Sequence, residues 1–292
     1  MERSKFQILN TLALKIIVIL TMSLDHVGSF LKMYFPNDSS IVLTGDIFRI
    51  FGRIAFPLVA LLFAEAMRHT KDRTHYISRL GLMTVIILAF EIGVYYGANV
   101  YLVDGNIFLT LLCSAVFIYF YESKGAKRLI TLAPASIIIM SFVTDILKSD
   151  QFYPTYLKAQ FSLYGFILCA GFYFIHYLSD KRVMELTGQN DPRPLREYPY
   201  YRSFTNLMWI ALLTVLTVFF WLISYINEKA DIYNIASQSY AMLAVIPIFF
   251  YNGKKGYQNK YFQYGCYLYY PLHILILFLC FYLTMGAPSI GW

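Results

Sequence analysis

Charged residues are scarce in this 292-residue sequence: they make up 14% of the chain, while hydrophobic residues make up 58%. Long polar stretches are also missing, the longest being 179–205, so the chain offers no segment for a separate water-soluble domain. This composition excludes an ordinary soluble globular protein. Walker, dinucleotide-fold and zinc-protease motifs are absent as well. We therefore expect one integral membrane domain over residues 1–292.

Cysteine is rare too. The four cysteines, Cys113, Cys169, Cys266 and Cys280, fall in apolar runs without the spacing of metal ligands. Such cysteines usually act as small apolar side chains, so we expect neither a metal site nor a disulfide framework.

What the sequence does have is a series of long apolar runs. A membrane-spanning helix needs roughly 20 apolar residues. Nine segments come close to or meet this length, and the eighth is short and contains Pro247. They cover 11–31, 47–67, 79–97, 106–121, 129–147, 158–178, 206–226, 239–251 and 261–282. The predicted fold is an all-α, polytopic helix bundle in a cell membrane, and whether 239–251 spans fully stays open.

Lysine and arginine predict the orientation of these helices. Eighteen of the 24 fall on segments that share a side of the membrane with the N-terminus, and only four fall on the opposite segments. Because positively charged loops remain in the cytoplasm, we expect a cytosolic N-terminus and an extracytoplasmic C-terminus. The net charge of +7 then reflects topology and contact with anionic inner-leaflet lipids rather than binding of nucleic acid.

A group of ionisable residues is predicted inside the membrane on its outer side. Asp25 and His26 lie in the first apolar segment, Arg49 and Arg53 share one face of the second, and His273 lies near the middle of the last. Such residues are costly in lipid and should face a shared interior cavity. Adjacent residues on a helix point about 100° apart, so we expect Asp25 to pair with an arginine rather than to orient His26.

Other features accompany this group. Pro57 removes the hydrogen bond to the carbonyl of Arg53, so the second helix should bend there. Further polar residues are predicted on the same side, and helix caps or interhelical hydrogen bonds explain each of them at least as well as a cavity does. These are Asn106, Thr110, Gln160, Ser162 and Gln238.

A second group of residues is predicted at the cytosolic side. One stretch carries Arg68, His69, Arg73 and Arg79, and the stretch "YNGKKG" carries Asn252, Lys254 and Lys255 between glycines. Flexible glycines beside cations can hold phosphate groups through backbone N–H groups and charge. The alternative is that both stretches are ordinary positively charged loops.

Several blocks of the sequence, in order, resemble the TraX family. They are "LKIIVILTMSLDHVGSFL", "FRIFGRIAFPLVALLFAEAMRHTKDRTHYISRL", "NIFLTLL", "SLYGFILCAGFYF" and "IPIFFYNGKKG…KYFQYGCYLYYPLH". TraX proteins are linked to N-terminal acetylation of conjugative pilin and belong to a broad superfamily of transmembrane acyltransferases. Those enzymes are thought to take acetyl from cytosolic acetyl-CoA and to deliver it across the bilayer with an intramembrane histidine and arginines.

The resemblance implies a role for both groups of residues. His26 would be the base, Arg53 and Arg49 would stabilise the thioester oxyanion, and Asp25 and His273 would complete the catalytic group. The cytosolic residues would hold acetyl-CoA as the acyl donor, and the acceptor would be a pilin N-terminus or a cell-surface glycan or polymer. Two other functions stay open: a transporter or channel that uses intramembrane His and Arg, and a non-enzymatic assembly factor for a surface structure.

Overall fold

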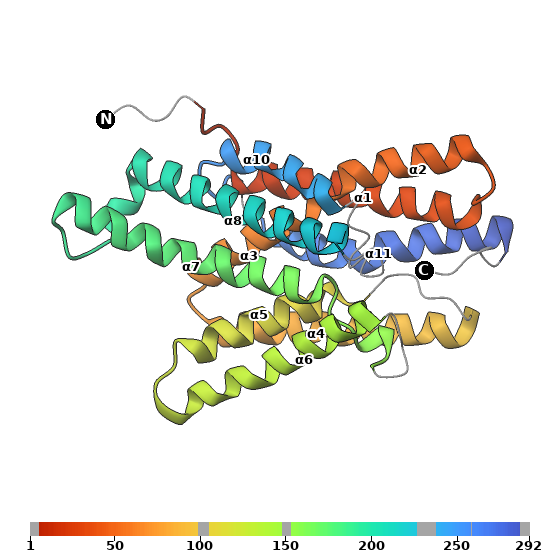
Figure 1. The fold of residues 1–292 in the computed structure, drawn as a ribbon, viewed down its shortest axis with the longest axis horizontal. Helices are drawn as coiled ribbons and strands as arrows, with labels where there is room; N and C mark the ends of the chain where they lie inside the picture. The colour runs from red at the N-terminus through yellow and green to blue at the C-terminus, as the bar shows by residue number, and fades with distance from the viewer. Residues whose placement is uncertain (1–5, 99–104, 148–152, 227–237, 258, 287–292) are drawn as a thin grey trace.

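The protein forms an elongated bundle of helices that run mostly along its long axis (Figure 1). The computed structural model describes residues 6–98, 105–147, 153–226, 238–257 and 259–286. Within these ranges there is no β-strand, and only isolated bridges join Leu9 to Tyr251 and Asn106 to Ala159. The predicted all-α fold is therefore confirmed. Arg3, Lys5, Lys148 and Lys229, which enter the charge argument, lie outside the described residues.

The bundle is made of ten α-helices within the described ranges. They are α1 (Thr11–Tyr34), α2 (Ser39–Gly52), α3 (Ala55–His69), α4 (Arg73–Ala98), α5 (Ile107–Tyr121), α6 (Leu132–Leu147), α7 (Ser162–Thr187), α8 (Pro199–Ile226), α10 (Val245–Phe249) and α11 (Lys260–Met285). Short 3₁₀ helices cover Gly125–Thr131, Thr155–Leu157, Pro194–Glu197 and Ser239–Ala244.

The helices have the lengths expected of a multi-pass membrane protein. Among the described residues, seven helical stretches are long and apolar enough to cross a membrane, with Ser39–His69 counted as one. Two further apolar helices, Ile107–Tyr121 and Ser239–Phe249, are shorter. All nine predicted segments are thus helical, and seven reach the length of a span.

Several predicted boundaries were wrong; the third and seventh segments, for example, start at Arg73 and Pro199 instead of residues 79 and 206. The second segment starts at Ser39 instead of residue 47, because the Asp38 carboxylate caps the helix by accepting from the N–H groups of Ser40 and Ile41. The sixth was expected to end at residue 178, but α7 continues to Thr187 and ends at Gly188 in the left-handed conformation. The last turns of α7 are polar, so a search for apolar runs does not detect them.

The predicted bend beside Arg53 is confirmed. The α-helix is interrupted at Arg53 and Ile54, between the end of α2 and the start of α3, although both residues keep right-handed helical dihedral angles. Pro57 lies in the first turn of α3, where a missing backbone N–H costs no hydrogen bond within the new helix. The break places Arg53, which is buried, in the interior of the bundle.

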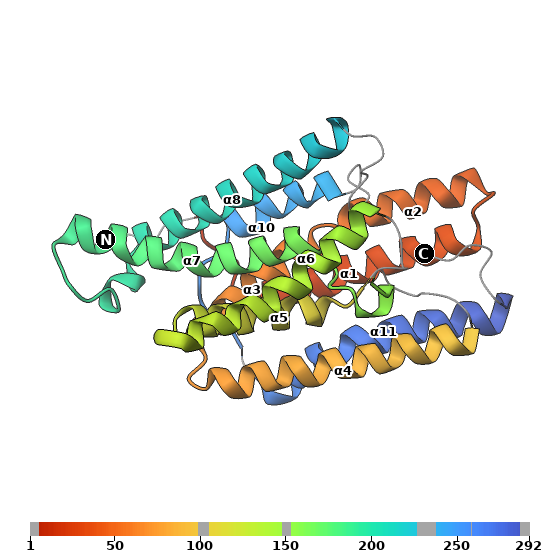
Figure 2. The same cartoon turned by 60° about the horizontal axis from the view of Figure 1, so that its bottom comes forward.

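Helix α3 lies at the centre of the bundle. Ten of its 15 residues are buried, and it packs against α1, α5 and α7. In the turned view, α4 and α11 are both drawn along the lower edge of the bundle (Figure 2). The centre of the molecule is therefore a helix with Arg53 beside its start and with Glu65, Arg68 and His69 near its end.

Three of the additional polar residues, Asn106, Thr110 and Ser162, have structural roles. Asn106 caps α5 and also donates to the Thr84 carbonyl at 2.9 Å. Thr110 donates to the Gln160 carbonyl at 2.5 Å, and Ser162 donates to Asp145 at 2.7 Å. These bonds fix the chain entering α7 against α4, α5 and α6, which agrees with the interpretation of these residues as caps and interhelical bonds.

Candidate functional site

Two histidines that are far apart in the sequence meet inside the bundle. Nε2 of His273, on α11, lies 2.9 Å from Nδ1 of His26, on α1. Their side chains are only 8% and 7% exposed. This contact could not be found from sequence spacing, because 247 residues separate the two positions.

The surrounding carbonyls determine which ring nitrogens carry protons. Nδ1 of His273 lies 2.7 Å from the Tyr269 carbonyl, and Nδ1 of His26 lies 3.0 Å from the Met22 carbonyl. A carbonyl can only accept, so both Nδ1 atoms are donors in the neutral pair, and Nε2 of His273 accepts from Nδ1–H of His26. Nε2 of His26 is left with a lone pair and has no partner among the described residues.

Asp25 faces the arginines of the second segment, as the sequence predicted. Its Oδ1 lies 3.7 Å from Nε of Arg53, an ion-pair distance that is too long for a hydrogen bond. Both of these buried atoms lack a hydrogen-bond partner within the described residues. Gly52 allows this approach, because a Cβ at that position would overlap Asp25. Arg49 packs one turn away, against Gly28 of α1.

Two residues that the sequence reasoning missed hold the His273 ring in place. The Tyr269 ring stacks on it, with centroids 4.7 Å apart and planes 8° apart. The Tyr269 hydroxyl lies 2.5 Å from Oγ of Ser23, which itself donates to the Ile19 carbonyl. The available signal was the "YYPLH" stretch, in which an aromatic ring precedes His273 by one helical turn.

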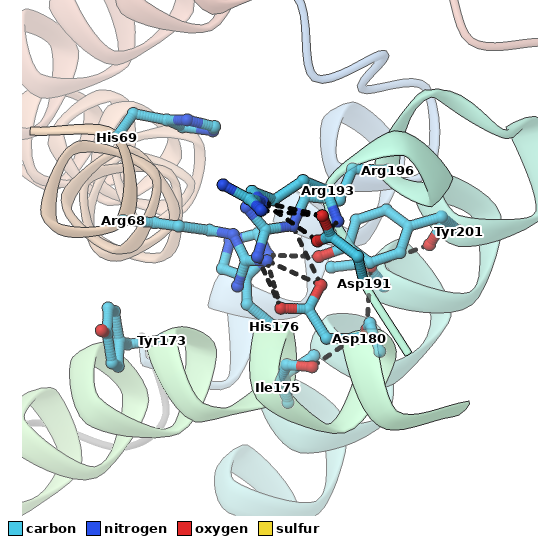
Figure 3. Close-up of polar contacts among 12 residues, drawn as sticks. Arg68, His69, Tyr173, Ile175, His176, Asp180, Asp191, Arg193, Arg196 and Tyr201 are labelled. Atoms are coloured by element: carbon cyan, nitrogen blue, oxygen red, sulfur yellow. Dashed lines mark hydrogen bonds and ion pairs between the residues drawn. The ribbon is translucent and has the colours of Figure 1, made fainter. Parts of the chain in front are cut away.

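At the other end of α3, carboxylates neutralise part of the predicted cationic group. Figure 3 shows Arg68, from α3, and Arg196, from the α7–α8 connection, both directed at the Asp180 carboxylate. Arg68 donates at 2.8 and 2.7 Å, and Arg196 at 3.1 and 2.8 Å. Partial burial opposes the charge on Arg196, but its bonds to Asp180 raise the pKa of this guanidinium. Arg73 is likewise paired, with Glu122 and with the Tyr173 hydroxyl.

A second buried carboxylate, Glu65, organises the neighbouring residues. It accepts from Arg202 at 2.7 Å and from His69 at 3.1 Å, and His176 lies 3.8 Å away. The Arg202 guanidinium also lies near the rings of Trp209 and Tyr251, at 5.7 and 5.1 Å from their centroids. His69 remains 46% exposed, so its other ring nitrogen is open to a ligand.

The "YNGKKG" loop packs against Arg202, the residue that is bound to Glu65. Gly253 has φ +72°, and a Cβ there would overlap the Arg202 guanidinium. The Asn252 N–H donates to the Leu9 carbonyl, and the Asn252 side chain accepts from the N–H of Lys254. The side chains of Lys254 and Lys255 are exposed, and within the described residues neither pairs with a carboxylate.

The structure thus divides the predicted donor-binding residues. His69, Asn252, Lys254 and Lys255 gather around the loop and its support, whereas Arg68 and Arg73 are held in ion pairs. Arg79 lies over the Tyr76 ring, 5.7 Å from its centroid. Sequence reasoning missed Arg202, His176 and Asp180 as members of this region, because nothing local in their stretches marks them as partners of α3.

Comparison with known proteins identifies the family of this chain. The family model described as TraX protein matches residues 10–183, which is more than half of the sequence. The chain belongs to the TraX family. The match includes Asp25, His26, Arg49 and Arg53 as well as the end of α3 that carries Arg68 and His69, while His273 and the "YNGKKG" loop lie beyond it.

A second comparison covers nearly the whole length of this protein. A probable fimbrial assembly protein FimC, serogroup H1, from Dichelobacter nodosus is 23% identical over 273 residues, covering 90% of this chain and 92% of that protein. No solved structure matches.

Proposed function

We propose that this TraX family protein is a membrane-embedded acyltransferase, which moves acetyl from cytosolic acetyl-CoA to an acceptor on the extracytoplasmic side of the cell membrane. The observation that carries the proposal is the buried His26–His273 pair, with one imidazole lone pair open beside Asp25 and Arg53. A neutral imidazole in a water-poor cavity can act as a base near neutral pH.

The geometry supports direct acyl transfer. Nε2 of His26 takes the proton as the acceptor amine or hydroxyl attacks the thioester carbonyl, while Arg53 and Arg49 stabilise the oxyanion. The resulting imidazolium keeps its Nδ1–H bond to His273, which disperses the charge. Collapse of the adduct breaks the C–S bond, completes the new C–N or C–O bond, and returns the proton from His26 to the thiolate of CoA.

The cytosolic end of α3 supplies the donor site in this proposal. The exposed Lys254 and Lys255 attract the phosphates of CoA, and Asn252 and His69 offer hydrogen bonds beside them. Sixteen residues separate Arg53 from His69, a rise of about 24 Å along a helix. A donor held at the loop therefore has to extend its thioester arm alongside α3.

The acceptor is proposed from the relatives. The Dichelobacter nodosus protein is named as a probable fimbrial assembly protein, which favours a pilus subunit, with its N-terminus as the acceptor. A surface glycan or polymer is the other acceptor of suitable chemistry. The same name also favours a second candidate function, a non-enzymatic assembly factor, in which the buried histidines would be purely structural.

Purified protein in liposomes, given acetyl-CoA labelled in its acetyl group, distinguishes these functions. We expect label to reach a pilin peptide or glycan acceptor with wild-type protein, and His26→Ala to lower turnover by about 10²–10⁴-fold. Binding of acetyl-CoA should change little, because a base acts in the transition state. Thr21→Ala, a buried change on the same helix, is the matched control. Turnover of His26→Ala within a few-fold of wild type would exclude His26 as the base, and no transfer of label by wild-type protein would leave only the assembly role.

A further inference from the structure

One buried phenol next to the histidine pair has no hydrogen-bond partner. Tyr270, on α11, is 5% exposed, and its hydroxyl meets no partner among the described residues. Buried hydroxyls are almost always paired, since an unpaired one costs about 1–3 kcal/mol. The hydroxyl of the neighbouring Tyr269 does have a partner, because it is hydrogen-bonded to the Ser23 hydroxyl. A bound ligand that supplies the missing hydrogen-bond partner would explain this exception.

The Tyr270 ring is held in place by its packing. It meets His26 edge-on, with centroids 6.2 Å apart, and His273 edge-on at 5.9 Å. Phe108, from α5, packs edge-on against it at 5.4 Å. Three rings from three helices therefore restrict its rotation, so the position of its hydroxyl does not depend on a hydrogen bond.

The unpartnered atoms around the histidine pair differ in their chemistry. Oδ1 of Asp25 accepts, Nε of Arg53 donates, and the Tyr270 hydroxyl can do either. Nε2 of His26 adds an accepting lone pair. Such a set matches the adduct of acyl transfer, which has an oxyanion that accepts hydrogen bonds and an attacking N–H or O–H that donates one.

We propose that Tyr270 is a catalytic residue that donates its hydroxyl hydrogen to the carbonyl oxygen of the thioester as the oxyanion forms, alongside Arg53. The inference rests on the acyltransferase function proposed above. A phenol has an ordinary pKa near 10, so it stays protonated at physiological pH and remains a donor throughout. No bond to Tyr270 forms or breaks, and its hydrogen bond weakens as the carbonyl re-forms and the C–S bond breaks.

The test is Tyr270→Phe in the full-length protein in liposomes, with labelled acetyl-CoA. Loss of one oxyanion donor should lower turnover by about 10²–10³-fold, with affinity for acetyl-CoA unchanged. The melting temperature should stay the same or rise, because the change removes an unpaired buried hydroxyl. A purely structural tyrosine would not give lower turnover together with undiminished stability.

Tyr34→Phe is the matched control. Tyr34 is also buried, lies two turns beyond His26 on α1, and donates to the Gly286 carbonyl at 3.2 Å. It should lose stability and keep its turnover per folded molecule. If wild-type protein transfers no label, the acyltransferase function and the role of Tyr270 both fail. If wild type is active and Tyr270→Phe turns over within threefold of it, or if that variant melts several degrees lower, only the role of Tyr270 fails.

Discussion

The two ring nitrogens of His26 have different surroundings, and this difference decides what the residue can do. Nδ1 is occupied by the Met22 carbonyl and by Nε2 of His273. Nε2 has no hydrogen-bond partner among the described residues. A proton taken up at Nε2 produces an imidazolium whose opposite N–H already has an acceptor, so His273 positions His26 and stabilises its charged form.

Replacement of His273 tests this positioning role. His273→Ala should lower turnover by about 10–100-fold, because Nδ1–H of His26 loses one of its two acceptors and keeps only the Met22 carbonyl. His273→Gln should recover part of the loss, since its amide oxygen can accept the same bond. Single-turnover acetyl transfer by the two variants provides the measurement. Equal losses in both would show that the imidazole is needed for something other than accepting a hydrogen bond.

Among the elements, the "YNGKKG" loop has the most specific backbone requirement. Gly253 combines a positive φ with direct contact between its backbone and the Arg202 guanidinium. The loop therefore keeps its shape only while Arg202 stays bound to Glu65 and no side chain occupies position 253.

We expect Gly253→Ala to destabilise this conformation by about 1–2 kcal/mol and to weaken binding of acetyl-CoA. Gly265→Ala is the matched control, because Gly265 is helical and has no neighbour within 4 Å of an added Cβ. That change should be neutral or slightly stabilising. Donor affinity and melting temperature of both variants are the quantities to compare. An unchanged affinity in Gly253→Ala would separate the loop from the donor site.

Local features of the sequence were enough to predict the apolar helices, the bend before Pro57 and the pairing of Asp25 with an arginine. Each depends on residues within a few turns of one another or on a simple charge requirement. The contacts of His26 with His273 and of Glu65 with Arg202 join distant positions, so they depend on how whole helices pack. The polar end of α7 was missed for a different reason: Asp180 is stabilised there by Arg68 and Arg196, which no apolar pattern reports.

For the whole molecule, the connection between α1 and α2 and the connection between α7 and α8 lie at opposite ends of the bundle (Figure 1). The sequence predicts that the first is extracytoplasmic and the second cytosolic. With the four native cysteines replaced, Asn37→Cys should react with an impermeant thiol reagent in whole cells, and Asn190→Cys should react only after lysis. Position 37 is preferable to Asp38, which caps α2. The reverse pattern would place the histidine pair near the cytosol.

The separation of two polar groups by the length of α3 has an electrical consequence under the proposed reaction. The phosphates of CoA remain at the cytosolic loop, so their charges do not enter the field across the membrane, where each would cost about 2.3 kcal/mol per 100 mV. What crosses is formally an acetyl cation moving outward, and a proton from the acceptor returns to the thiolate of CoA. With a neutral acceptor the exchange carries no net charge. The membrane potential then neither drives nor opposes the reaction, and the thioester bond alone supplies the free energy for modifying a molecule outside the cell.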